Sequence, residues 1–367
     1  MTAGSTAARP SVVVLGGGYA GINVAKALDD VADVTLVDPK QAFVHNVAGW
    51  RALVEPEWLE RIFLPYDRLL ANGTFVQDRA VAVAAGRVTL ASGRVLEPDF
   101  LVLATGSAYP FPAKTDETEV ATARARLLAA HEALLAADRV LIVGAGPSGL
   151  ELAGEIKAFF PAKHVTLVDA ADDILTGPYD QPLRDELRRQ LDTMEVDVRL
   201  GDAPRELPTA QPATLDTILI ATERGDDLEA DIWFRAFGVR PHSSYLDGTS
   251  LDDRGYVHVD DHLRLAGETN VFAVGDVSDA DRDMAGIASR QAGLVAANIR
   301  ALITAEGELA SYARFPPMIA IPLGPEGGAG FIGDGVADAA TISKLKGRHM
   351  LIDNYAALFD AAPSSTA

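Results

Sequence analysis

Glycines at a fixed spacing are the first residues in this sequence whose pattern indicates chemistry. Gly16, Gly18 and Gly21 form a G-x-G-x-x-G pattern between a Val-rich run and an amphipathic stretch. Gly16 permits a tight turn, Gly18 lets the backbone approach a pyrophosphate, and Gly21 lets a helix pack closely on the preceding strand. Asp38 ends the next apolar run, 22 residues after Gly16, where a carboxylate can bind ribose hydroxyls. The segment predicts a dinucleotide whose phosphates lie at a helix N-terminus.

A second set of glycines repeats this pattern. Gly144, Gly146 and Gly149 begin 128 residues after the first set, and Asp169 ends the following apolar run, 25 residues after Gly144. Two complete fingerprints predict two bound dinucleotides. Because the Asp169 carboxylate repels a 2′-phosphate and the two alanines after it carry no cation, we expect NADH to bind the second site in preference to NADPH.

Both glycine patterns require the same supporting elements, in the order strand, turn, helix, strand. We expect these elements at 11–15, 19–28 and 34–37 in the first unit, and at 140–143, 148–159 and 165–168 in the second. Between the units, alternating segments at 74–83 and 87–96 predict antiparallel strands, and 123–137 predicts a helix. The sequence is therefore of the α/β class with a duplicated dinucleotide-binding architecture.

Composition excludes several classes of site. The 367 residues contain no cysteine, which rules out a disulfide framework, a thiolate metal site and a cysteine nucleophile. A net charge of −20 disfavours nucleic acid and anionic membranes as partners. No run of about 18 apolar residues predicts a membrane span, and the start is not a signal peptide, so we expect a cytoplasmic protein.

A metal site is not expected. His258 and His262 are four residues apart, but their neighbours alternate as in a strand, which would separate the two rings by about 13 Å at roughly 3.3 Å per residue.

Two further strand ends extend the pattern of the glycine loops. A strand at 101–103 runs into Ala104, Thr105 and Gly106, and a strand at 270–274 runs into Gly275 and Asp276. With the two fingerprints, these segments resemble the two-dinucleotide-binding-domain flavoprotein superfamily. That resemblance implies that Asp276 binds the ribityl chain and flavin end of FAD in the first unit. The FAD domain would then be split by an inserted NAD domain.

A second resemblance, over longer segments, indicates one branch of this superfamily. The stretch at 43–54, which contains His-Asn and Arg-Ala, is similar to apoptosis-inducing-factor-like proteins of the ferroptosis-suppressor type, as are 104–112 and 149–157. These relatives are FAD-dependent NAD(P)H:quinone oxidoreductases, and the similarity runs from about 11 to about 358. Members of the superfamily with a redox-active cysteine pair are excluded by the absence of cysteine, so electrons are expected to pass directly from the flavin to an outside acceptor.

The resemblance also implies roles for individual residues. Arg51 would contact FAD, and the backbone of Val81 would touch its adenine end. Glu151 would lie near the nicotinamide, and Lys346 would lie near the flavin and the quinone pocket; the alternative for both is solvated surface charge. His45 would be a proton donor or a positioning residue.

Gln291 has two interpretations. It would line a quinone site, by looser similarity to type II NADH dehydrogenases, or be an exposed helix residue. The expected catalytic residues are therefore Glu151, Lys346 and His45. The expected cofactor-binding residues are Gly16, Gly18, Tyr19, Ala20, Gly21, Asp38, Lys40, Asn46, Arg51, Val81, Ala104, Thr105, Gly106, Gly144, Gly146, Pro147, Ser148, Gly149, Asp169, Gly238, Gly275, Asp276 and Gln291.

The domain boundaries follow from these units. We expect the first part of the FAD domain at 9–115, the NAD(H) domain at 116–245, the second part of the FAD domain at 246–310 and a small C-terminal domain at 311–360, with tails at 1–8 and 361–367.

The leading functional hypothesis is an FAD-dependent NADH oxidoreductase with ping-pong kinetics and a small acceptor, best a quinone. Position 2 is not glycine, so no myristoyl anchor is expected, and the basic charge near the C-terminus is too small for firm membrane attachment. One alternative is a reductase of a ferredoxin- or rubredoxin-type carrier, and another is a slow-turnover redox-sensing flavoprotein. A monomer or a homodimer fits each of these.

Overall fold

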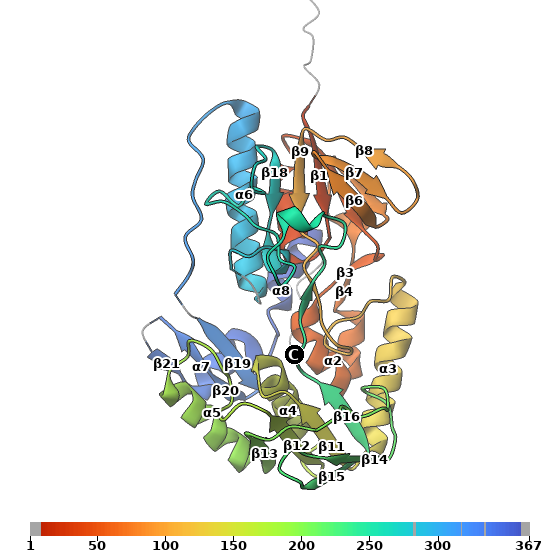
Figure 1. Cartoon of the computed structure of the whole chain (residues 1–367), viewed down its shortest axis with the longest axis vertical. Coiled ribbons are helices and arrows are strands. Elements are labelled where there is room, and N and C mark those ends of the chain that lie inside the picture. Colours follow the sequence, from red (N-terminus) through yellow and green to blue (C-terminus); the bar gives the residue numbers. More distant parts are fainter. Residues whose placement is uncertain (1–8, 282–283, 317, 334, 361–367) are drawn as a thin grey trace, which may run out of the picture.

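The computed structural model describes residues 9–281, 284–316, 318–333 and 335–360. The tails expected at 1–8 and 361–367 lie outside the described residues. Figure 1 shows two α/β units stacked along the long axis, with the C-terminal strands packed beside the lower one.

The first unit is built on a five-stranded parallel sheet with the strand order β18-β9-β1-β2-β5. Its strands are β1 (Ser11–Leu15), β2 (Asp33–Asp38), β5 (Thr74–Gln77), β9 (Phe100–Leu103) and β18 (Val271–Ala273). Strand β18 pairs with β9 although the whole second unit lies between them in the sequence. The sheet of the first unit is therefore completed from both sides of the insertion, which confirms the expected split.

Two helices cover one face of this sheet. Helices α1 (Tyr19–Leu28) and α6 (Ala285–Thr304) pack on each other through small and branched side chains, including Ala20, Ile22 and Ala292. The small residues let the two helix axes approach closely, so the N-terminus of α1 is held rigidly at the end of β1.

The expected arrangement of the segment at 74–83 was wrong in part. Its first strand, β5, joins the main sheet in parallel beside β2. The chain then leaves the sheet and forms the antiparallel layer β6 (Ala80–Ala84), β7 (Arg87–Leu90) and β8 (Val95–Leu96). Alternation along a strand indicates one buried and one open face but does not give the direction of its partner.

The second unit has a four-stranded parallel sheet with the order β13-β12-β11-β16. Its elements are α3 (Val120–Ala136), β11 (Arg139–Val143), α4 (Pro147–Phe159), β12 (His164–Asp169), α5 (Gln181–Thr193), β13 (Val196–Leu200), β14 (Ile218–Ala221), β15 (Asp227–Ala230) and β16 (Ile232–Arg235). The predicted strand–turn–helix–strand order holds in both units, within one residue at each end of the elements.

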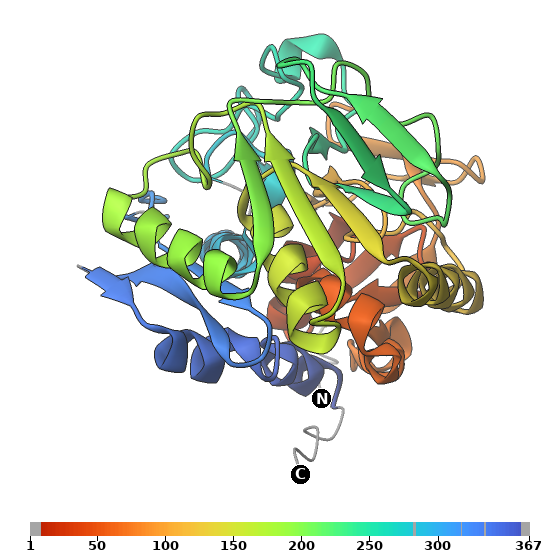
Figure 2. The ribbon, with the colours of Figure 1, turned by 90° about the horizontal axis from the view of Figure 1, so that it is seen from below.

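The strands of the C-terminal segment pack against the second unit, as Figure 2 shows beside α5, whereas its last residues, Tyr355, Ala356 and Phe359, belong to the buried cluster of the first unit. The segment contains β19 (Ile319–Leu323), β20 (Gly327–Ile332), β21 (Gly335–Ala337), α7 (Ala339–Ile342), the π-helical segment η6 (Ser343–Gly347), α8 (Ile352–Ala356) and η7 (Ala357–Phe359). Strand β19 lies against α4, where a Cβ on Gly154 would come 2.4 Å from the Cα of Leu323.

Short elements complete the chain. They are β3 (Ala42–Val44), η1 (Asn46–Ala48), α2 (Gly49–Val54), η2 (Pro56–Glu60), β4 (Phe63–Pro65), η3 (Tyr66–Arg68), β10 (Ser107–Ala108), β17 (Arg240–Pro241), η4 (Gly248–Ser250) and η5 (Gly275–Val277). Strands β10 and β17 pair where the chain crosses between the two units. Among the residues that the structure describes, no helix is both long and apolar enough to cross a membrane.

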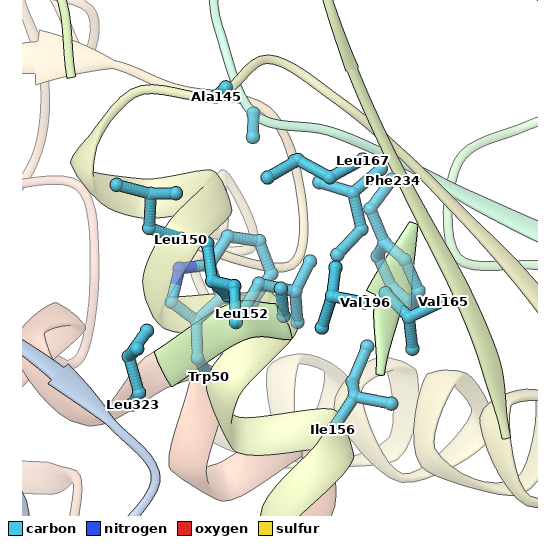
Figure 3. Packing of buried hydrophobic residues seen from close by; sticks show 14 of the residues in the cluster. Trp50, Ala145, Leu150, Leu152, Ile156, Val165, Leu167, Val196, Phe234 and Leu323 are labelled. Atoms are coloured by element: carbon cyan, nitrogen blue, oxygen red, sulfur yellow. The ribbon is translucent and has the colours of Figure 1, made fainter. Parts of the chain in front are cut away.

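One hydrophobic core joins three parts of the chain. Trp50 of α2, Leu150 and Leu152 of α4 and Leu323 of β19 belong to the same buried cluster, seen in Figure 3. Burying one such side chain contributes about 1.5–3 kcal/mol. The relative position of α2, α4 and the C-terminal strands is therefore set by shared packing.

The strand expected around His258 and His262 does not form. A bridge between Val259 and Leu265 folds the chain back on itself, with Leu263 at a φ of 62° in the turn. Nδ1 of His258 lies 2.7 Å from an Asp279 carboxylate oxygen, whereas Nδ1 of His262 bonds the carbonyl of Ala310.

Candidate functional site

The two glycine loops have the same geometry. Gly16 and Gly144 have φ of 98° and 112°, values that favour glycine because a side chain would clash with its own backbone. The amide of Gly16 donates to the carbonyl of Val37 at 2.7 Å, and that of Gly144 donates to Val168 at 2.8 Å. Each loop is thus tied to the end of the neighbouring strand.

The three glycines of each loop differ in what surrounds them. A Cβ on Gly21 would lie 1.8 Å from the Gly16 carbonyl oxygen, and one on Gly149 would lie 1.9 Å from that of Gly144. By contrast, nothing lies within 4 Å of a Cβ built on Gly18 or Gly146. The outer glycines are required by the fold, while the middle ones border open space at a helix N-terminus. This arrangement fits a pyrophosphate in both loops.

The two strand-end acids are held alike. Asp38 accepts hydrogen bonds from the amides of Gly17 at 2.7 Å and Lys40 at 2.8 Å. Asp169 accepts from the amides of Ala145 at 2.6 Å and Ala171 at 2.8 Å. Both carboxylates therefore lie directly beside their glycine loops, where ribose hydroxyls are expected.

Burial shifts the pKa values of Asp38 and Lys40, which lie beside the first loop. Burial raises the pKa of Asp38, against the opposing effect of the Gly17 amide and Lys40. It lowers the pKa of the Lys40 ammonium, and the Asp38 carboxylate opposes that shift.

Several polar side chains lie together where β9 and β18 end. Thr105 donates to the carbonyl of His242 at 2.6 Å, and Ser107 donates to the Asp276 carboxylate at 2.8 Å. The ammonium of Lys114 lies 3.3 Å from the same Asp276 oxygen. Lys114 was not expected at the site, because it lies in a Pro-rich stretch of the sequence with no motif spacing.

Gln291 is not an exposed helix residue. It is fully buried, accepts a hydrogen bond from the Gly275 amide at 2.6 Å, and donates to the carbonyl of Asp281 at 2.8 Å. The side chain thus holds the loop that carries Asp276. A contact of Gln291 with a quinone stays a prediction.

His45, which is fully buried, and Tyr19, which is partly buried, form a chain of hydrogen bonds. Nε2 of His45 donates to the carbonyl of Met350 at 2.7 Å, so Nδ1 is the acceptor, facing the Tyr19 hydroxyl at 3.3 Å. That hydroxyl also accepts from the amide of Val47 at 3.0 Å. Burial lowers the pKa of His45 to about 4, although the Met350 carbonyl opposes the shift. His45 is therefore neutral at pH 7 and links the first loop to the C-terminal segment.

Glu151 and Lys346 meet although they are far apart in the sequence. The Lys346 ammonium lies 2.6 Å from a Glu151 carboxylate oxygen, and the two side chains are only 16% and 17% exposed. The alternative of solvated surface charge is thus wrong for both. Glu151 lies one turn into α4, and Lys346 lies in η6, so this ion pair joins the helix of the second loop to the C-terminal segment.

A second ion pair lies one turn further along α4. Arg51 donates from Nε and Nη2 to the two carboxylate oxygens of Glu155, at 2.6 and 2.9 Å, and from Nη2 to the carbonyl of Gly347 at 2.8 Å. Their side chains are 2% and 0% exposed. Removing one partner of such a buried pair typically costs about 3–5 kcal/mol.

The ion pair with Glu155 bears on the role expected for Arg51. Its guanidinium is engaged by Glu155 and Gly347, and the expected contact with FAD stays a prediction. Glu155 was not singled out from the sequence; its position four residues after Glu151, on the same helix face, is the signal that could have found it.

The remaining expected residues surround the loops. Ser148 accepts a hydrogen bond from the Trp50 indole at 3.1 Å, which ties α2 to the second loop. Pro147 is exposed at the start of α4, and Ala20 is buried in α1. Asn46 is half-buried in η1.

Three expected residues lie at backbone irregularities. Gly106 and Gly238 have φ of 66° and 97°. A register shift between β6 and β7 leaves Val81 at a bulge, with its side chain half exposed. Ala104 is tied to the first loop, because its amide donates to the carbonyl of Leu15 at 2.7 Å.

Comparison with known proteins identifies close counterparts. Residues 10–297 match the family described as pyridine nucleotide-disulphide oxidoreductase. Apoptosis-inducing factor homolog A of Dictyostelium discoideum is 30% identical over 95% of this chain and 91% of its own length. Ferroptosis suppressor protein 1 of Homo sapiens is 32% identical over 78% of this chain and 79% of its own length.

Solved structures agree with this assignment at the level of the fold. The sulfide:quinone oxidoreductase of Aquifex aeolicus superposes with a TM-score of 0.76 at 18% identity, over 97% of this chain and 93% of that one. The chain belongs to the pyridine nucleotide-disulphide oxidoreductase family, among relatives of apoptosis-inducing factor and ferroptosis suppressor protein 1, and is an FAD-dependent NAD(P)H oxidoreductase.

Proposed function

We propose that this oxidoreductase takes hydride from NADH and passes the electrons to a small neutral acceptor, most simply a quinone. The observation that carries the proposal is the complete absence of cysteine in a member of a disulphide-oxidoreductase family. No dithiol can take electrons from the flavin, so the acceptor must receive them directly. The net charge of −20 favours a neutral acceptor over an acidic carrier protein.

NADH is proposed over NADPH because of the second strand-end acid. The Asp169 carboxylate is held beside the glycine loop by the amides of Ala145 and Ala171. A fixed negative charge at this position accepts hydrogen bonds from a ribose 2′-hydroxyl and repels a 2′-phosphate.

The chain's own residues orient the reactants. Bound FAD supplies the group that accepts a hydride from NADH and gives up two electrons. The middle glycines of the two loops would hold the phosphates, Asp38 and Asp169 would bind the ribose hydroxyls, and Asp276 would bind the flavin end of FAD. Glu151 and Lys346 form a shielded ion pair in which the ammonium can stabilise negative charge on an acceptor oxygen. The solved structure named sulfide:quinone oxidoreductase has this fold, which supports a quinone as one acceptor that the fold serves.

The test is a flavin spectrum followed by addition of NADH without oxygen, and then an acceptor screen at saturating NADH. Bleaching of the visible flavin band and turnover with benzoquinones or naphthoquinones are expected. A flavin band that NADH does not bleach would contradict the hydride step, and a higher kcat/KM with NADPH would contradict the cofactor preference.

A carrier-protein reductase is the second candidate, because one group of cations is concentrated locally. Arg126, Arg235 and Arg240 line a pocket at the crossover between the two units. Arg126 is already paired with Asp116 and Glu117, which leaves less positive charge for an acidic carrier. A strong decrease of carrier-linked turnover with ionic strength would favour this candidate over a quinone reductase.

A further inference from the structure

Two acids on one face of α4 engage two consecutive residues of the C-terminal segment. Glu151 pairs directly with Lys346. Glu155, one turn later, binds Arg51, which in turn donates to the carbonyl of Gly347. Arg51 comes from α2 of the first unit, so the three parts of the chain that share the hydrophobic core are also joined by these polar contacts.

The segment that receives these contacts has an unusual backbone. Residues 343–347 form a π-helix, a rare conformation that is found frequently at functional sites. A Cβ on Gly347 would lie 2.6 Å from the carbonyl oxygen of Pro325, so glycine is needed for the segment to approach the β19–β20 turn. The backbone of Gly347, next to Lys346, therefore contacts this turn on one side and Arg51 on the other.

The ion pair between Arg51 and Glu155 has a defined geometry. The guanidinium contacts both oxygens of one carboxylate and a carbonyl, which defines its orientation as well as its distance. Burial raises the pKa of the Glu155 carboxyl, and the contact with Arg51 opposes that shift. Removal of either partner would leave a buried group unpaired beside the segment.

We infer that Arg51 and Glu155 are positioning residues: they hold the π-helical segment so that Lys346 meets Glu151 on the acceptor side of the reaction. This role rests on the proposed function, and it assigns Arg51 an action through Gly347 and Lys346 instead of a contact with FAD. Arg51 and Glu155 then affect acceptor turnover without setting flavin affinity.

The test compares Arg51→Lys with Lys346→Gln and with the double variant, in the flavin-loaded enzyme. For Arg51→Lys we expect unchanged flavin content, at least about a fivefold loss of kcat/KM for a benzoquinone, and faster hydrogen exchange of the amides in 343–350. In the Lys346→Gln background, the same change should alter kcat/KM less than about twofold, because it acts through the same lysine. Independent, multiplying effects would overturn the inference, as would loss of flavin in Arg51→Lys.

A matched control and a second variant guard against general destabilisation. Arg348→Lys alters an exposed ion pair of the same segment with Glu326 and should leave turnover and exchange unchanged. The double change Arg51→Met with Glu155→Met replaces the buried pair by apolar groups, so it should stay folded yet lose the acceptor turnover. Full turnover in this folded variant would overturn the inference. If no quinone is reduced by the wild type, the proposed function fails, while hydrogen exchange and flavin content still decide the role of Arg51.

Discussion

The two dinucleotide-binding units have nearly the same loops but different helices behind them. In both units, the first glycine bonds the neighbouring strand and the strand-end acid accepts two backbone amides. The positions that correspond to Glu151 and Glu155 in the second unit are Asn23 and Ala27 in the first. Asn23 donates to the carbonyl of Tyr19 in its own helix at 2.7 Å and lies 3.4 Å from the Ser289 hydroxyl of α6, whereas both glutamates form ion pairs with other parts of the chain.

We expect this difference between α1 and α4 to reflect two roles, cofactor binding in the first unit and the reaction with the acceptor in the second. The shared loop geometry fits a pyrophosphate, and we expect each of the two loops to bind one. Helix α1 packs against α6 through small apolar residues and serves as a rigid support. Helix α4 carries two buried or half-buried acids toward the C-terminal segment. We therefore expect Glu151 and Glu155 of the second unit, through their ion pairs, to affect the reaction with the acceptor.

The largest expected effect comes from filling the open space at the middle glycines. Gly18→Ala should fold normally but lose most of its flavin, because the added methyl takes the space of the pyrophosphate while nothing in the protein opposes it. Gly146→Ala should keep its flavin and raise the KM for NADH at least about tenfold, or about 1.4 kcal/mol. The ratio of visible to ultraviolet absorbance and steady-state kinetics measure both. Loss of flavin in Gly146→Ala would contradict the assignment of the two loops.

The next effect is expected at Glu151, whose counterpart in the first unit is Asn23 and not an acid. Glu151→Gln should lower kcat roughly tenfold or more, because the Lys346 ammonium loses its charged partner. The corresponding change Asn23→Ala is expected to alter kcat less than about threefold. Stopped-flow reduction by NADH and turnover with a quinone separate the two half-reactions. Equal losses in the two variants would mean that the helices do not differ in function.

A smaller effect should distinguish the two strand-end acids. Asp169→Asn removes the negative charge from the second loop and should reduce the preference for NADH over NADPH by about fivefold to tenfold, as the ratio of the two kcat/KM values. Asp38→Asn is the matched change in the first loop and should leave that ratio unchanged. A shift of the ratio in Asp38→Asn would show that the first loop binds the nicotinamide dinucleotide.

The last effect is on stability and not on activity: it is the pH dependence of the free energy of unfolding that comes from His45. Its pKa in the folded protein is about 4, against an ordinary value of 6.5, so the unfolded chain binds a proton between these values that the folded protein does not. Stability should therefore fall as the pH drops from 7 to 5, by about 2 kcal/mol from this residue. Thermal unfolding of the wild type and His45→Asn at both pH values measures the difference. An equal fall of Tm in both proteins would contradict a neutral buried His45.

Local patterns were sufficient for the parts of the site that depend on neighbouring residues. The loops at Gly16 and Gly144 could be predicted because a tight turn between a strand and a helix demands glycine at fixed spacings, and Asp38 and Asp169 follow from the length of the next strand. Strand β5 was assigned the wrong direction because alternation along one strand carries no information about its partner.

The sequence by itself determined the two dinucleotide-binding units, the family and the absence of a dithiol, since each depends on residue type and short-range spacing. Only the tertiary structure decided which of the 32 basic and 52 acidic residues meet. Arg51 and Glu155 are 104 positions apart, and Lys346 and Glu151 are 195 apart. The burial of Gln291 was likewise decided by packing. Charge alone does not select such partners, because the faces that come together depend on how α2, α4 and the C-terminal strands share one core.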